Sequence, residues 1–453
     1  MANSKRKIIT TTVVNNYTPI HPALDFTEDT AIVSVGIQLR HDYENNDIEF
    51  KDGELTVLSD GDYFIYSRKA LAEKGYYYSR SLDLPIGRWE YDDLIRFCEE
   101  TKFEGVDIDL ISTYTTIKER IDFFMDFENP VYLDLLSCFI IYTYFYPLFA
   151  SAPILQLWGD IKTGKTKTAS LISALCFNPI DSANISESCV FRAIEGQRAV
   201  VLLDESEDLA TSERGKAICN LLLAGYNKSG KTYRQEKLFD GAYKTVSFKV
   251  FGPKVIANVT GISMPALQSR VIRLILTGAA DKNKTNRDVD LEDPIFAKIR
   301  NKLYRIAMTQ HRAIFRAREE LQNTTLNDRT LGIWQGILTI ASLIDKTILD
   351  NLVSYAITNM ADIQEELDMN DSGTAVLKRL YLFVEEKGNG EYKIGDLYKF
   401  IHQDENLLDI TLRGLSITMK RLGFNNKLKR FEKTVARYYN LTSEKLLARI
   451  SRH

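Results

Sequence analysis

The sequence predicts an α/β fold in which a mostly parallel five-stranded sheet is flanked by helices, within a chain of several domains. From residue 153 onward, short apolar runs alternate with helical stretches, as in sheets whose parallel strands are joined by helices. A glycine-rich run separates the first of these strands from the first helix. The length of 453 residues, with 45% hydrophobic and 26% charged residues, suits a globular protein of roughly two to four domains.

The first part of the chain is expected to form a small β-rich unit followed by helices. Residues 31–35 and 55–58 are apolar runs bounded by turn-forming residues, and helical periodicity extends from residue 91 to 149. The apolar run 131–150 is long enough to span a membrane, but it carries Asp134, four tyrosines and Pro147. Because a carboxylate is costly in lipid, we expect a buried helix and no membrane contact.

The central sheet and the elements after it complete the predicted organisation. The expected strands are residues 154–158, 180–182, 199–203, 254–258 and 271–276. A helical region runs from residue 297 to 344, and three helical segments with a basic hairpin after residue 373 are typical of a winged helix. The predicted domains are a β-rich unit (1–90), a helical collar (91–150), an α/β core (151–290), a helical lid with a linker (291–370) and a winged helix (371–453).

Cysteine and charge patterns limit the kinds of site and partner. The five cysteines are scattered and form no C-x-x-C pair, which disfavours a zinc site or disulfide framework and suits a reducing, cytoplasmic location. Residues 1–12 lack the apolar stretch of a secretory signal. The net charge is −3, but residues 420–453 hold ten Lys/Arg against two Glu, a balance of +8 that leaves −11 for the rest. We therefore expect any nucleic-acid contact to be localised.

A complete phosphate-binding motif follows the first strand of the sheet. It matches G-x-x-x-x-G-K-[ST] with the residues Gly159, Asp160, Ile161, Lys162, Thr163, Gly164, Lys165 and Thr166. Glycines in this motif let backbone N–H groups approach phosphate, the lysine reaches the β and γ oxygens, and the hydroxyl ligates Mg²⁺. A strand enters the run and a helix leaves it, so phosphate would lie at a helix N-terminus. The sequence therefore predicts a site for ATP and Mg²⁺.

A second run, residues 225–232, matches the same pattern. It follows a helical stretch and leads into a polar segment, so the strand–loop–helix context is absent. We interpret the second match as a coincidence.

The other half of the predicted ATP site follows some forty residues after the first motif. The apolar strand ends in Asp204 and Glu205. Asp204 at the strand tip can hold Mg²⁺, and Glu205 can orient and deprotonate the attacking water. An apolar strand that ends in a solvated acidic turn has the same local pattern, but the spacing from the glycine-rich loop favours the ATPase interpretation.

Two further residues complete the predicted catalytic set. Asn258 ends a strand, where its amide can lie between the carboxylates and the γ-phosphate, although a strand-ending Asn alone is more often a turn residue. Arg270 ends a short helix before the last strand, too far to reach its own nucleotide easily, but able to reach a neighbour's as an arginine finger. A surface arginine that makes a salt bridge is the alternative, and Arg273 is a rival for the role.

This order of motifs resembles the core of AAA+ ATPases. More narrowly, the run Phe-Gly-Pro-Lys-Val-Ile-Ala-Asn at residues 251–258 and the run Leu-Asn-Asp-Arg at residues 326–329 resemble hexameric helicases of phages and mobile elements, either MCM-like or superfamily 3-like. The resemblance covers roughly residues 130–453. It implies a homohexameric ring that translocates on single-stranded DNA, and it implies Arg329 as a lid sensor, with Arg273 a further sensor candidate. The N-terminal unit matches no primase motif, so priming is not implied.

Basic residues in two places are candidates for DNA contact. Turn signals between residues 226 and 248 predict an inserted hairpin, and in helicases of the resembled kind such hairpins reach into the pore, where cations follow phosphates and aromatic rings stack on bases. The candidates there are Lys228, Lys231, Arg234 and Lys244. In the winged helix they are Lys429, Arg430 and Arg437, which would hold duplex phosphates. A merely solvated hairpin and a winged helix used for protein contacts are the alternatives.

Together these patterns favour an ATP-dependent DNA helicase or replication initiator. An AAA+ regulator or protein-remodelling ATPase is the alternative, since it would share the ATP site, but it would grip peptide with an aromatic pore loop and need no basic C-terminal wing. A binding module with a silent ATPase is disfavoured because every catalytic motif is intact.

Overall fold

The computed structural model describes residues 17–103, 109–182, 185–204, 212–237, 241–259, 261–262, 264–321, 326, 328–370, 372–404, 407–422, 424, 426–431 and 434–450. The chain divides into two compact units, Met1–Asn359 and Met360–His453.

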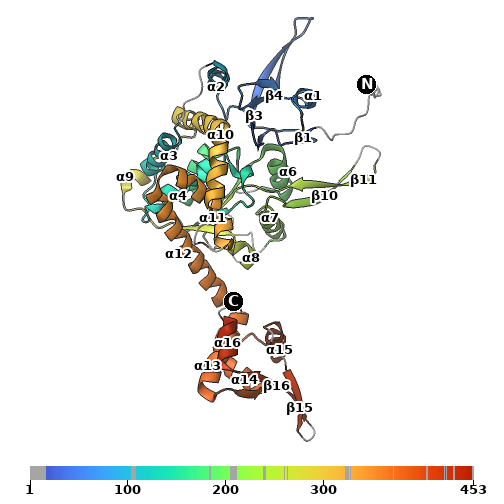
Figure 1. Ribbon diagram of the computed structural model, residues 1–453, viewed down its shortest axis with the longest axis vertical. Coiled ribbons are helices and arrows are strands. Elements are labelled where there is room, and N and C mark those ends of the chain that lie inside the picture. Colours follow the sequence, from blue (N-terminus) through green and yellow to red (C-terminus); the bar gives the residue numbers. More distant parts are fainter. Residues whose placement is uncertain are drawn as a thin grey trace. The chain divides into compact units, whose positions relative to one another are not determined.

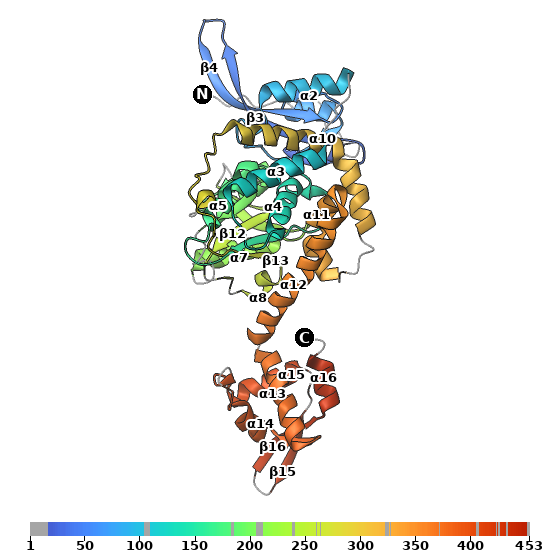
Figure 2. The same ribbon diagram turned by 90° about the vertical axis from the view of Figure 1, so that its left-hand side faces the viewer.

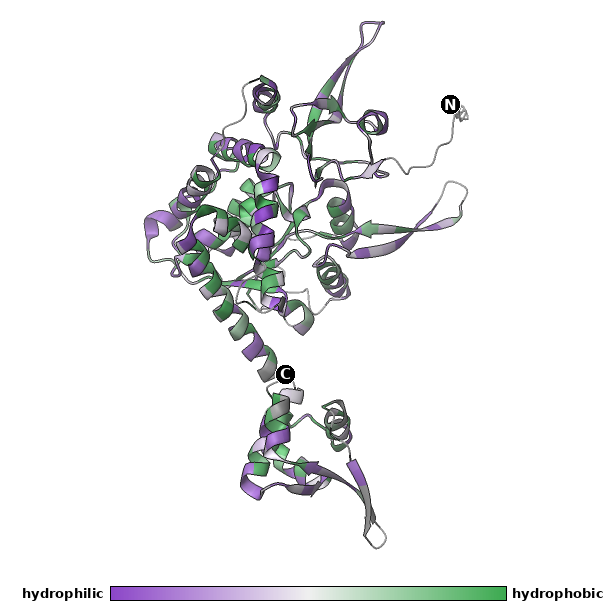
Figure 3. Ribbon diagram, viewed as in Figure 1, coloured by the Kyte–Doolittle hydropathy of each residue, from purple (hydrophilic) through white to green (hydrophobic). Residues whose placement is uncertain are grey.

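The core of the first unit is a five-stranded, all-parallel sheet (Figure 1). Its strands are β7 (Ile154–Trp158), β8 (Pro179–Asp181), β9 (Val200–Leu203), β12 (Lys254–Asn258) and β13 (Val271–Ile275). Their order is β13-β7-β12-β9-β8, so the strand that precedes the glycine-rich loop lies inside the sheet. The five expected strands are confirmed to within one residue. The strands are hydrophobic in Figure 3 and mostly buried, as short apolar runs require.

Helices connect these strands and cover the sheet. They are α5 (Lys165–Leu175), α6 (Glu187–Gln197), α7 (Glu213–Ala224) and α8 (Pro265–Gln268). The starts of α6 and α7 are fixed by Ser186 and Ser212, whose hydroxyls accept hydrogen bonds from the backbone N–H groups of Cys189 and Gly215.

The N-terminal part is rich in β-structure, as expected. Strands β2 (Leu24–Phe26), β3 (Ala31–Asp42), β4 (Ile48–Leu58) and β5 (Tyr63–Ile65) form an antiparallel sheet, and β1 (Thr18–Pro19) pairs with β6 (Tyr76–Tyr77) on either side of α1 (Arg68–Glu73). Strands β3 and β4 are much longer than the apolar runs that predicted them. Their distal halves form a projecting, solvent-exposed hairpin (Figure 2), where no buried face enforces a hydrophobic pattern.

Helices before and after the sheet pack together in the first unit. They are α2 (Tyr91–Phe103), α3 (Leu110–Phe124), α4 (Val131–Tyr142), the short η1 (Tyr146–Leu148), α9 (Lys282–Thr285), α10 (Pro294–Leu321) and α11 (Asp328–Ile344). The expectation that the apolar run around α4 is a buried helix is confirmed. Its Asp134 is buried, pairs with Lys118 and accepts a hydrogen bond from Tyr114. Among the described residues, no helix is long and apolar enough to cross a membrane.

A two-stranded antiparallel hairpin is inserted between α7 and β12. It consists of β10 (Lys231–Lys237) and β11 (Tyr243–Lys249), and it projects from the sheet in Figure 1.

The second unit has its own hydrophobic core. Helix α12 (Lys346–Asn370) runs across the boundary between the units and is followed by α13 (Ser372–Lys387), β14 (Gly390–Lys393), α14 (Ile394–Ile401), α15 (Leu412–Arg421), β15 (Asn426–Phe431), β16 (Thr434–Leu441) and α16 (Ser443–Ile450). The strands form an antiparallel sheet in the order β14-β16-β15. Leu380, Leu397, Leu415 and Tyr439 pack at the centre of the unit.

Candidate nucleotide-binding and nucleic-acid-binding sites

The glycine-rich loop joins the end of β7 to the start of α5. Gly164 has φ of 90° and Lys162 has φ of 68°, so the loop turns through the left-handed region just before the helix begins. At Gly159 a Cβ atom would lie 2.2 Å from the carbonyl oxygen of Leu276, which no side chain could accommodate. The two motif glycines are therefore required by backbone geometry, and the first turn of α5 is left open to an anion.

The lysine of the loop is held by carbonyl oxygens that a phosphate could replace. The Nζ of Lys165 donates to the carbonyl oxygens of Gly159 and Asp160, at 2.8 and 2.7 Å. Thr166, the next residue, is exposed on the first turn of α5. Within the part of the chain that the structure describes, this amino group bonds only to the loop and lies beside a hydroxyl at a helix N-terminus. The arrangement fits the β- and γ-phosphates of ATP and their Mg²⁺.

Two carboxylates end neighbouring strands of the same sheet. Asp204 directly follows β9, and Asp181 is the last residue of β8, which pairs with β9. Partial burial, and then the negative charge of Asp204, raise the pKa of Asp181, so the two groups are close enough to interact. Sequence reasoning missed Asp181, although it lies in an expected strand at the edge that carries the loop. Glu205 lies outside the described residues.

Asn258 occupies a buried position next to the loop strand. It is in register with Trp158, the last residue of β7, and its Nδ2 donates to the carbonyl oxygen of Gly261 at 2.7 Å. Its Oδ1 accepts from Nε2 of Gln156 at 3.3 Å. Gln156 in turn accepts from Nε of Arg273 at 3.2 Å, so a buried polar chain crosses β12, β7 and β13. Arg273 is thus inside the fold, with its guanidinium 4.8 Å from the centre of the Trp158 ring.

Arg270 and Arg329 lie at the other edge of the sheet. Arg270 directly precedes β13, whose five residues span about 13 Å at roughly 3.3 Å per residue, whereas the loop follows the opposite end of the paired strand β7. The guanidinium of Arg270 lies 5.5 Å from the ring centre of Tyr226. Burial raises the pKa of Tyr226, while a hydrogen bond with Ser151 and the charges of Arg270 and Arg329 oppose the rise. Arg329 is therefore near Tyr226 and Arg270, and the structure does not bring it to the loop of its own chain.

The inserted hairpin has one exposed face that combines lysines with tyrosines. Tyr233 and Tyr243 are 61% and 68% exposed. Strand alternation and the pairing register put further residues on the same face, namely Lys231, Gln235, Lys237, Thr245 and Lys249. Of these residues, only Lys231 was predicted from the sequence to contact DNA. The opposite face packs on α6, where Phe248 contacts Phe191 with ring centres 4.6 Å apart.

The other predicted DNA contacts of the first unit lie apart from this face. The Nζ of Lys228, at the base of the hairpin, donates to the carbonyl oxygen of Pro147 at 2.5 Å. Arg234 forms an ion pair with Glu187, and its guanidinium lies 5.0 Å from the ring centre of Phe191. Lys244 is exposed, but it lies opposite Glu236 in the strand register, on the face toward α6.

In the second unit, the predicted basic residues belong to the β15–β16 hairpin. Arg437 is exposed, and its Nη1 donates to the hydroxyl of Ser416 on α15 at 2.7 Å. Lys429 and Arg430 lie on β15, and their side chains are outside the described set.

The second glycine-rich match spans the end of α7, a turn and the start of β10. Gly225 caps α7, and at Gly230 a Cβ atom would lie 1.9 Å from the carbonyl oxygen of Ala224. These glycines therefore serve a tight backbone crossing, and no helix follows the lysine of this run.

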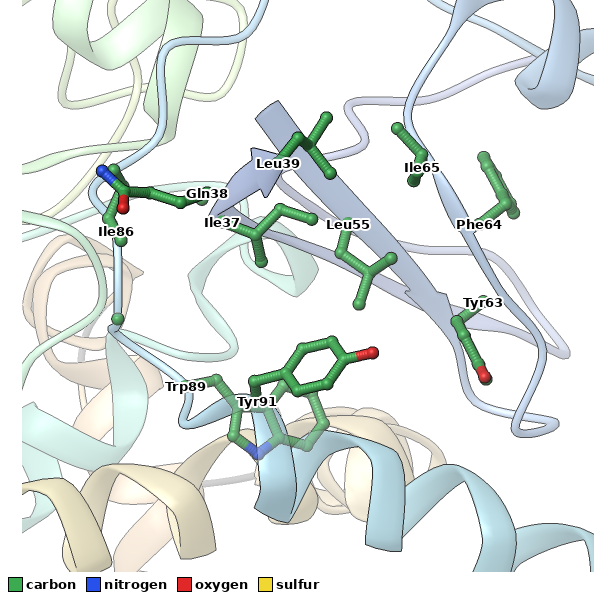
Figure 4. Close-up of a pocket in the computed structure, with 12 residues that line it drawn as sticks. Ile37, Gln38, Leu39, Leu55, Tyr63, Phe64, Ile65, Ile86, Trp89 and Tyr91 are labelled. Atoms are coloured by element: carbon green, nitrogen blue, oxygen red, sulfur yellow. The ribbon is translucent and has the colours of Figure 1, made fainter. Parts of the chain in front are cut away.

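A pocket of about 490 Å³ lies elsewhere, in the N-terminal β-rich part (Figure 4). Ile37 and Leu55 face Trp89 and Tyr91 across it. No Lys, Arg, Asp or Glu lines this pocket, so it lacks the groups that bind a nucleotide phosphate.

Comparisons with known proteins find similarity among solved structures. No protein-family model and no curated protein matches the chain. The SCCmec type IV Cch active helicase is 12% identical, with a TM-score of 0.43, over 94% of this chain and 97% of that one. The apo NrS-1 C-terminal region is 10% identical (TM-score 0.32, 86% and 94%), and an inhibitor-bound JCV helicase is 14% identical (TM-score 0.24, 56% and 82%). Two of these three structures bear the name helicase.

Proposed function

We propose that this protein is an ATP-driven DNA helicase that works as a homohexameric ring. The observation that carries the proposal is the division of the candidate ATP site between the two edges of the sheet. The phosphate loop, Asp204 and Asn258 lie at the carboxyl edge, while Arg270 precedes a strand at the amino edge. If Arg270 is an arginine finger, it can act only on the nucleotide of a neighbouring subunit, and a closed ring of identical subunits gives every loop such a neighbour.

Each group at the carboxyl edge has a role in phosphoryl transfer. Lys165 would bind the β- and γ-phosphates in place of its present carbonyl acceptors, and Thr166 with Asp204 would hold the metal. Mg²⁺ bound there supplies charge neutralisation for the phosphates. Glu205 would take the proton of the attacking water, and Asn258, held by Gln156, would position that water or the γ-phosphate.

At the amino edge, Arg270 and Arg329 would both face the nucleotide of the adjacent subunit. Their shared proximity to Tyr226 supports a joint role, with Arg270 as the finger and Arg329 as a second cation on the same phosphates. Arg329 would then sense the nucleotide of the adjacent subunit, whereas a lid sensor acts on the nucleotide of its own chain. Arg273 would act within its own chain, because it bonds to Gln156 beside Asn258.

The inserted hairpin would contact single-stranded DNA in the pore. Its exposed face carries lysines, which follow a phosphate backbone, and Tyr233 and Tyr243, on which bases of any sequence can stack. The second unit would act as a winged helix: α14 and α15 form the helix-turn-helix, and the basic β15–β16 hairpin is the wing that holds duplex phosphates.

A strand-displacement assay on forked DNA tests the function. We expect ATP-dependent displacement by the wild-type protein and none by Lys165→Ala, which removes the phosphate contact. Absence of displacement and of DNA-stimulated ATPase activity in a verified hexamer would reject the helicase assignment. ATPase activity stimulated by an unfolded polypeptide, and not by DNA, would establish the alternative of a protein-remodelling ATPase.

A further inference from the structure

Lys254 is a buried lysine with no part in the proposed chemistry. It is the first residue of β12 and is 1% exposed. Its Nζ donates to the carbonyl oxygen of Gly225 at 2.8 Å and to that of Gly252 at 2.5 Å. Burying an ammonium group is costly, and an apolar side chain of similar size would fill the same space without that cost.

The two acceptors of Lys254 stand at the two ends of the inserted hairpin. Gly225 ends α7 just before the insertion, and Gly252 lies between β11 and β12 just after it. The backbone N–H of Gly252 also donates to the carbonyl oxygen of Gly225 at 3.4 Å. At Gly225 a Cβ atom would lie 2.0 Å from the carbonyl oxygen of Val250 and 2.7 Å from Nζ of Lys254. One side chain therefore holds the entry and the exit of the hairpin against each other.

The same strand carries Asn258 at its other end. β12 lies between β7 and β9 and pairs with both, so it is a stiff element with little freedom to bend. Lys254 and Asn258 are four residues apart, or about 13 Å at roughly 3.3 Å per residue. If binding or loss of the γ-phosphate displaces Asn258, β12 would move as a rigid strand. The segments that are bonded to its first residue, Lys254, would move with it.

We propose that Lys254 is a positioning residue that fixes the root of the hairpin to the strand bearing Asn258, so that the nucleotide state sets the position of the DNA-binding face. The inference rests on the proposed helicase function. Because both ends of the insertion accept a hydrogen bond from one amino group, the hairpin follows β12 and does not swing about its own root. Burial lowers the pKa of Lys254 to about 7, and a neutral amine still donates two hydrogen bonds, which matches the two acceptors.

The main test compares Lys254→Met and Lys254→Gln with Lys216→Met, an exposed lysine on α7 that serves as the matched control. We expect Lys254→Met to keep basal ATPase activity and nucleotide affinity, but to lose stimulation by single-stranded DNA by roughly 2- to 30-fold, the range of coupling residues remote from ligands. Unwinding should fall in parallel. Lys254→Gln, which retains one donor group, should recover part of the stimulation, and Lys216→Met should behave as wild type.

Three outcomes of this comparison overturn the proposal. One is stimulation and unwinding by Lys254→Met equal to wild type. Another is an equal loss of basal and stimulated ATPase activity, which would make Lys254 a structural brace of the sheet. The third is a failure of Lys254→Gln to recover any of the lost stimulation.

Hydrogen exchange on the wild-type protein provides a measurement that needs no variant. Addition of a non-hydrolysable ATP analogue without DNA should change the exchange of β10 and β11 amides as well as that of β12. Changes confined to β12 and the phosphate loop would reject the coupling, even if Lys254→Met failed to fold. A wild-type protein with coupled exchange but no response to DNA would instead reject the helicase function and leave the coupling standing.

Discussion

The two edges of the five-stranded sheet are built from different kinds of contact. At the carboxyl edge, Lys165 and Asp204 are partly exposed, and each lies in the segment that directly follows a strand of the sheet. At the amino edge, Lys254 is buried between segments that precede and follow the inserted hairpin, and Tyr226 lies between Arg270 and α11. The carboxyl edge is therefore made of partly exposed side chains from local segments, while the amino edge connects elements that the proposed ring would move. Substitutions at the two edges should differ in what they disable.

Arg270→Ala should have the largest effect and should separate the edges most clearly. We expect hydrolysis to fall by about 10³- to 10⁵-fold, the contribution of an arginine finger, with nucleotide binding kept because the loop is intact. A mixture with Lys165→Ala protein should regain activity at junctions where both edges are wild type. Mixed rings, verified by mass, that show no recovery would contradict a finger acting between subunits.

Glu205→Gln tests the carboxyl edge with the next largest effect. Because it removes the general base and leaves the phosphate contacts, ATP binding should persist while turnover falls by about 10²- to 10⁴-fold. Filter binding and steady-state hydrolysis measure the two quantities. Turnover near the wild-type rate would assign the base to another carboxylate, and Asp181, beside Asp204, would be the next residue to replace.

Tyr233→Ala and Tyr243→Ala probe the hairpin attached to the amino edge. Each should weaken single-stranded DNA binding by about 1–3 kcal/mol, the contribution of a stacked base, without changing the slope of log affinity against log salt. Lys237→Ala should instead lower that slope by about 0.7, since it removes one phosphate contact. Unchanged affinity in both tyrosine variants would show that the exposed face of the hairpin does not contact DNA.

Lys254 should also give the stability of the protein a pH dependence of its own. Its folded-state pKa of about 7 lies below the usual 10.5, so between these values the unfolded chain binds more protons than the folded one. The stability of wild type minus that of Lys254→Met should therefore rise with pH above about 7, by at most about 1.4 kcal/mol per pH unit, and level off below it. Urea unfolding at pH 7 and 9 measures this difference.

Most of the carboxyl edge was predictable from sequence because each of its groups ends or directly follows an apolar strand. All five strands of the sheet and the motif from Gly159 to Thr166 follow from apolar runs and local spacing. The amino edge was not predictable in the same way. A lysine that opens a strand normally stays hydrated, and the burial of Lys254 depends on Gly225, which is 29 residues earlier.

Other omissions have equally specific causes. Tyr233 and Tyr243 come to the same face only through the pairing register of β10 and β11, although the alternation Lys231, Tyr233, Gln235 and Lys237 was visible in the sequence. The extent of the β3–β4 hairpin was missed because its distal half is exposed and therefore free of hydrophobic patterning.

The second glycine-rich run has a consequence for stoichiometry. Its two glycines, Gly225 and Gly230, sit where a Cβ atom would lie within about 2 Å of a carbonyl oxygen, so backbone crossing alone accounts for their identity. The lysine of that run, Lys231, begins a strand on the outer face of the hairpin and has no helix behind it. A chain with two complete motif matches should therefore bind a single equivalent of nucleotide at saturation, and a hexamer six.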